Sequence, residues 1–142
     1  MRATNVPTSF RIVAVLALLW NLFGLFSFYL HVTAGPDVVA TWPEVQQQIA
    51  AATPRWIFVA FAIATIGGVL GSLGLLLRKR WAVPVLLLSL LGIVVQFGSI
   101  YAITPTWALT GIGGAILPLG IALFGLFLWW YARKAEARGW LS

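Results

Sequence analysis

Four long apolar stretches, separated by short segments that hold most of the charged residues, dominate the chain. They cover residues 12–30, 56–77, 81–101 and 111–131, and tyrosine is the only ionisable residue type within them. Each has about the 20 residues that a helix needs to cross the hydrocarbon core of a bilayer. Backbone polar groups in lipid must be satisfied internally, so the pattern predicts an all-α membrane protein. We expect four transmembrane helices in one bundle, a single domain over residues 1–142.

The connecting segments predict a turn and a short helix. Residues 102–110, which include Pro105, predict a turn between the third and fourth spans. The segment 31–54 is longer. Within it, Pro43 suits the first position of a helix and Glu44 suits the positive end of its dipole, while Pro54 ends it. We therefore expect an outer interfacial helix of about two or three turns over residues 45–52, which lies on the membrane or caps the bundle.

Basic residues are distributed unevenly about these spans. Arg55 lies on one side of the membrane, with Asp37 and Glu44. Every other basic residue falls on the opposite side: Arg2, Arg11, Arg78, Lys79, Arg80, Arg133, Lys134 and Arg138. Because lysine and arginine concentrate in cytoplasmic loops, we expect both chain termini in the cytoplasm.

Composition excludes several classes of function. Hydrophobic residues make up 61 % of the chain and charged residues 8 %, against about 45–50 % and 25 % in an average globular chain. Too few charges remain to cover a water-soluble particle, so a soluble enzyme, a nucleic-acid-binding domain and a disordered chain are excluded. The chain has no cysteine, so disulfides and thiolate metal sites are excluded as well.

Groups that carry catalysis are scarce. The three acidic residues lie outside the spans, and His31 is the only histidine. With no carboxylate pair, no cluster of metal ligands and no nucleophile beside a base, we expect neither an enzyme nor a metal site. No cofactor is required, although a pigment, quinone or lipid between the spans stays open. His31 is either a porphyrin ligand or pH-sensitive group, or an interfacial residue that closes a helix, and we favour the last.

Two further basic sites have alternative interpretations. Arg55 is the only base on its side of the membrane, so it either snorkels to the headgroups, pairs with Glu44 or Asp37, or engages a partner. The run Arg78, Lys79 and Arg80 links the second and third spans. It is typical of a topology signal that also attracts anionic headgroups, and a dedicated ligand site is the alternative.

Polar and small residues inside the spans predict contacts. Asn21 lies near the middle of the first span and Gln96 in the outer half of the third. Each amide either hydrogen-bonds another helix or lines a site for a solute, and we favour the helix contact. Close helix packing, within the chain or against a partner, is expected at Gly67, Gly68, Gly71, Ser72 and Gly74. Pro118 should bend the fourth span, because proline removes a backbone hydrogen bond.

The chain resembles a family of small four-helix bacterial inner-membrane proteins that often carry the label "sugar transporter" or are uncharacterised. The resemblance covers nearly the whole chain and rests on Pro7-Thr8-Ser9-Phe10, Trp20-Asn21-Leu22, Pro54-Arg55-Trp56, Gly67-Gly68 with Gly71, Leu77-Arg78-Lys79-Arg80-Trp81-Ala82, Leu88-Ser89-Leu90, Gln96, Pro118, Gly125-Leu126-Phe127-Leu128 through Arg133-Lys134, and Gly139-Trp140-Leu141-Ser142. It implies a multi-pass protein of the bacterial inner membrane. It brings no catalytic or binding motif, and Arg55 stands where a small residue is expected.

Two functions from different classes fit these features. We expect a non-catalytic accessory or packing subunit, which contacts the lipid bilayer and other membrane-protein subunits or a second copy of itself. The alternative is a small-solute carrier or channel, for sugars in particular, that works as an oligomer and uses Asn21 and Gln96. Coupled transporters usually carry intramembrane ionisable groups, and the absence of these from the spans favours the accessory subunit.

Overall fold

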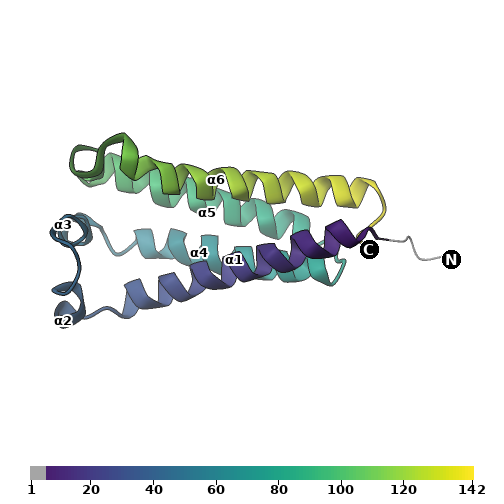
Figure 1. Ribbon diagram of the computed structural model, residues 1–142, viewed down its shortest axis with the longest axis horizontal. Helices are drawn as coiled ribbons and strands as arrows, with labels where there is room; N and C mark the ends of the chain where they lie inside the picture. The colour runs from purple at the N-terminus through teal and green to yellow at the C-terminus, as the bar shows by residue number, and fades with distance from the viewer. Residues whose placement is uncertain (1–5) are drawn as a thin grey trace.

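A computed structural model describes residues 6–142, and all of its regular structure there is helical. In chain order the helices are α1 (Thr8–Thr33), α2 (Pro36–Val39), α3 (Glu44–Ala52), α4 (Ile57–Leu76), α5 (Ala82–Ile103) and α6 (Thr106–Ala137) (Figure 1). Four of them, α1, α4, α5 and α6, are long and apolar enough to cross a membrane. The prediction of an all-helical chain with four spans is therefore confirmed, and the chain has the architecture of a multi-pass membrane protein. The predicted basic residue Arg2 lies outside the described residues.

The connections differ in detail from the predicted ones. The turn expected over residues 102–110 is shorter, because α5 runs to Ile103 and α6 begins at Thr106. The short turn is held by the Thr104 hydroxyl, which donates to the carbonyl of Ile100 at 2.6 Å. A break follows within α6 at Gly111, whose φ of 64° and ψ of −160° are not helical. The fourth span predicted from residue 111 thus starts at the point where the helix restarts.

The segment between α1 and α4 is more helical than its sequence suggests. Gly35, Pro36 and Asp37 are residue types typical of a turn, but Pro36 opens the four-residue helix α2, since its fixed φ suits the first position of a helix. The predicted short helix is present as α3, with Pro43 just before its first residue rather than within it. Both α2 and α3 lie at one end of the bundle, which we call the cap end (Figure 1).

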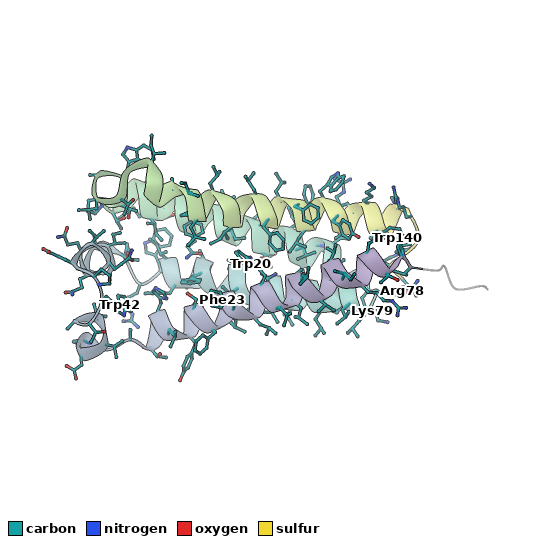
Figure 2. The ribbon with its side chains drawn as sticks, viewed as in Figure 1. Trp20, Phe23, Trp42, Arg78, Lys79 and Trp140 are labelled. Carbon is teal, nitrogen blue, oxygen red and sulfur yellow. The ribbon has the colours of Figure 1, made fainter. Side chains whose placement is uncertain are left out.

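The four long helices pack in a row rather than in a closed ring. Helix α1 packs against α4, α4 against α5, and α5 against α6. The start of α1, the α4–α5 loop and the end of the chain lie together at the other end, which we call the basic end (Figure 1). Figure 2 shows Arg78, Lys79 and Trp140 there and Trp42 at the cap end. At the basic end, α1 meets α6 and the tail that follows it. The ring of Phe10 lies 6.0 Å from that of Tyr131 on α6 and 5.5 Å from that of Trp140 in the tail.

The buried core lies between these helices near the basic end. Its members come from α1, α4, α5, α6 and the tail that follows α6: Phe10, Ala14, Ala17, Leu75, Ala82, Leu86, Leu128, Ala132, Ala135 and Leu141. Half of the most apolar stretch of α4 is buried, against 6 % for α6. Helix α4 is therefore the central element of the fold, and α6 is the most peripheral span.

Candidate functional site

The Asn21 amide joins α1 to α4. Its nitrogen Nδ2 donates to the carbonyl of Ala17 at 2.8 Å and to the hydroxyl of Ser72 at 3.1 Å. Ser72 is fully buried. On the other side of the amide, a Cβ added to Gly68 would lie 2.7 Å from Asn21 Cγ, so the glycine provides the space that the amide occupies. The polar residue predicted at mid-span therefore takes part in a contact between two helices.

The glycines predicted to mediate close packing on α4 contact α5 and the loop before it, within the same chain. A Cβ added to Gly67 would lie 3.2 Å from Ser89 Cβ, one added to Gly71 2.5 Å from Leu86 Cγ, and one added to Gly74 2.8 Å from the Trp81 ring. On the facing helix, a Cβ on Gly92 would lie 2.9 Å from the main-chain nitrogen of Ala64. Because these four glycines have no side chain, the backbones of α4 and α5 approach each other closely. We call this contact the glycine seam.

A hydrogen bond that the sequence did not indicate crosses the glycine seam. A serine or threonine within a helix often bonds a carbonyl of its own helix, as Thr65 does with Phe61 at 2.9 Å. Instead, the Ser89 hydroxyl donates to the carbonyl of Ala64 on α4 at 2.6 Å. The reason is the absence of a side chain at Gly67, which brings the two backbones close enough for this bond.

Gln96 is buried but lies apart from Asn21. Its side chain is 5 % exposed, and its amide makes no hydrogen bond to any described residue. It does not line the cavity beside Asn21. The structure therefore does not bring the two predicted intramembrane amides into one site.

Two hollows adjoin the middle of the bundle. A small cavity of about 30 Å³ is lined by all four long helices and includes Asn21, Gly68 and Ser89. A larger groove of about 620 Å³, which we call the α1–α6 groove, is open at the side and lined by Trp20, Gly113, Ile116, Leu117, Gly120, Ile121 and Phe124. Trp20 and Phe124, whose rings lie 5.5 Å apart, line both hollows. Figure 2 shows Trp20 and Phe23 midway along the bundle.

The residues at the cap end are held locally. His31 Nδ1 donates to the carbonyl of Ser27 at 2.7 Å, and its ring lies 5.2 Å from that of Trp42 and 5.9 Å from that of Phe61. His31 thus links α1 to the cap segment and to α4. Arg55 is exposed, and in residues 6–142 no carboxylate lies within salt-bridge distance of it.

The basic end is fastened by the tail of the chain, whose residues entered the sequence analysis only through the family resemblance. The main chain of Arg80 donates to the carbonyl of Ser142 at 3.0 Å, and that of Ser142 donates to the carbonyl of Arg78 at 2.9 Å. Arg78 has a φ of 59°, and its Nε donates to the carbonyl of Trp140 at 2.9 Å. Leu141 is 2 % exposed in the core. We call residues 139–142 the tail clasp; the apolar Trp-Leu pair after Gly139 was its only signal in the sequence.

Pro118 lies inside α6, and the departure from helical geometry in this helix is at Gly111.

In the part of the chain that the structure describes, no three His, Asp or Glu side chains come together as in a metal site. Lys79 lies in the α4–α5 loop, and its main chain donates to the carbonyl of Gly74 at 2.8 Å, which closes the end of α4.

No family model matches this chain, and no curated protein or solved structure is significantly similar to it. The resemblance to the small four-helix family therefore stays a prediction. The arrangement itself offers three chemical features: a hydrogen-bonded joint at Asn21, an apolar groove open at the side, and a basic end fastened by the tail clasp.

Proposed function

We propose that this chain is a non-catalytic accessory or packing subunit of a larger membrane complex. We place it in a bacterial inner membrane, with the basic end and both chain termini in the cytoplasm and α3 at the outer surface. The basic residues of the α4–α5 loop and of the end of α6 support this orientation, because such residues are retained on the cytoplasmic side.

The observation that carries the proposal is the α1–α6 groove. A Cβ added to Gly113 or Gly120 would meet nothing within 4 Å, and the neighbouring Ile116 and Leu117 are 70 % and 66 % exposed. In a bilayer, small residues on a helix surface let another helix approach closely, and dispersion then holds the pair. We therefore expect the transmembrane helix of a partner subunit to lie in this groove.

The packing of the interior agrees with a role in assembly rather than transport. Large side chains such as Phe10, Leu75 and Leu128 fill the basic end, and each is at most 2 % exposed. The small cavity of about 30 Å³ holds little more than the space that a single water molecule requires, about 10–15 Å³. A sugar is far larger than this cavity, which supports a packing role over a path for sugars between the helices.

Site-specific photo-crosslinking in native membranes tests the proposal. A photoreactive residue at Ile116, in the groove, should give one discrete protein adduct. The same residue at Val94, which is 55 % exposed on α5 outside the groove, serves as the matched control and should not. Adding Gly113→Leu and Gly120→Leu should abolish the Ile116 adduct while the chain stays folded. Lipid adducts alone, or equal protein adducts from both positions, would refute the proposal.

One observation favours the solute carrier as a second candidate. The groove and the small cavity share Trp20, Ile121 and Phe124, so the hollow that Asn21 lines adjoins the open groove at these side chains. Uptake of a sugar or other small solute by the purified chain in liposomes tests this candidate. Uptake that is lost in Asn21→Leu and Gln96→Leu, with the bundle still folded, would establish the carrier and overturn the accessory role.

A further inference from the structure

The small cavity at the middle of the bundle presents an unusual set of hydrogen-bonding groups. It lies where Asn21 of α1, Gly68 of α4, Ser89 of α5 and Phe124 of α6 meet. Its position halfway along the spans puts it at the depth where water is scarcest and unsatisfied polar groups cost most. The unused hydrogen-bond donors and acceptors around the cavity therefore determine what can bind there.

The two polar side chains beside Gly68, those of Asn21 and Ser89, have only acceptors left. Both hydrogens of Asn21 Nδ2 are used, one by the carbonyl of Ala17 and one by Ser72 Oγ. The single hydroxyl hydrogen of Ser89 is donated to the carbonyl of Ala64. Asn21 Oδ1 receives no hydrogen bond from any described residue, and Ser89 Oγ keeps its lone pairs.

These two acceptors flank the same face of Gly68. A Cβ built on that glycine would overlap Asn21 Oδ1 and would lie 3.4 Å from Ser89 Oγ. The Asn21 oxygen thus occupies the space that a side chain would fill at residue 68, with Ser89 Oγ beside it, and both residues line the cavity. A ligand in the cavity that bonds both oxygens must be small and must donate two hydrogen bonds.

We propose that this cavity is a binding site for one water molecule, which donates one hydrogen bond to Asn21 Oδ1 and one to Ser89 Oγ. Water supplies two donors, and the cavity of about 30 Å³ exceeds the space that one water needs. A cation fits poorly, because no carboxylate lies within the spans to balance its charge. The water joins α1 to α5 across Gly68 of α4, and the inference is independent of the proposed function.

Water-edited solid-state NMR of the whole chain in liposomes with deuterated lipids tests the site. Polarisation from water should reach the Gly68 α-carbon and the Asn21 amide carbon at short mixing times. Gly92 is the control: it is one turn closer to the cap end, but it packs against the α4 backbone and does not line the cavity. It should receive no signal at those times.

Two variants make the test specific. In Asn21→Leu and in Ser89→Ala, each of which removes one acceptor, transfer to Gly68 should fall to the level at Gly92. Ser89→Ala keeps the packing volume nearly unchanged, so it serves even if Asn21→Leu does not fold. A Gly68 signal that is absent from the native chain, or unchanged in a folded Ser89→Ala, would overturn the proposal. So would transfer to Gly68 from protonated acyl chains in deuterated water, which would assign the cavity to lipid.

Discussion

The close approach of α4 and α5 is tested most directly at Gly92. A methyl group added there would lie 2.9 Å from the main-chain nitrogen of Ala64 and 3.0 Å from the carbonyl oxygen of Ala60. Both are backbone atoms of a helix, which cannot turn aside as the end of a side chain can. Gly92→Ala must therefore push the two helices apart along the glycine seam. Gly98, on the same helix, has nothing within 4 Å of the same added atom.

The expected difference in stability follows from this geometry. Overpacking a well-packed contact by one or two carbon atoms costs about 1–3 kcal/mol. Replacing glycine by alanine in a helix also gains about 0.5–1 kcal/mol of helix propensity, but both variants gain it, so the gain cancels in the comparison. We therefore expect Gly92→Ala to be about 1–3 kcal/mol less stable than Gly98→Ala.

Unfolding in mixed micelles of increasing sodium dodecyl sulfate content, followed by the fluorescence of the eight tryptophans, measures this difference. Gly92→Ala should unfold at a lower detergent fraction than the native chain, and Gly98→Ala at the same or a higher one. Equal midpoints for the two variants, or a more stable Gly92→Ala, would refute the close approach of the two backbones.

Three further predictions use the same titration. Gly111→Ala should destabilise the chain by about 1–3 kcal/mol, since φ of 64° with ψ of −160° is accessible essentially to glycine alone; Gly113→Ala, on the open face of α6, should not, and equal effects would contradict the break at residue 111. Leu141→Ala should cost about 2–5 kcal/mol if the tail clasp fills the core, whereas the exposed Leu117→Ala should cost little; a neutral Leu141→Ala would show that the clasp is not formed. Ser89→Ala should lose about 0.6–2 kcal/mol with its bond to Ala64, and Ser99→Ala, for which no bond to another helix is seen, is its control; an unchanged midpoint for Ser89→Ala would mean that this bond contributes nothing.

The number and rough limits of the spans could be predicted from the sequence because hydrocarbon imposes one strong rule on length and polarity. Gly67, Gly71 and Gly74 could be named because small residues at short spacing along a membrane helix are typical of close helix packing. Gly98, which has nothing within 4 Å, shows that a glycine in a span does not by itself indicate such a contact. The partners of Gly67, Gly71 and Gly74 could not be predicted. Nothing in the sequence said that Gly71 would face Leu86 of this chain rather than another subunit.

Two features were out of reach because they depend on tertiary geometry. The direction of the Ser89 hydroxyl depends on the distance between two backbones, and no local pattern encodes that distance. The tail clasp depends on pairing between residues 78–80 and 140–142, which are about sixty residues apart in the chain. Gln96, which sequence reasoning grouped with Asn21 by chemistry, is buried elsewhere, since residue type alone does not say which helix face meets which.

The glycine seam has a consequence for the order in which the protein assembles in the bilayer. Its two helices, α4 and α5, are consecutive and are joined by five residues, so little loop entropy opposes their meeting. This hairpin is expected to form first, as soon as both helices are inserted. Helix α1 then joins it through Asn21, and α6, the least buried span, arrives last. Substitutions in the seam should therefore delay insertion-coupled folding, while substitutions along α6 should affect only its completion.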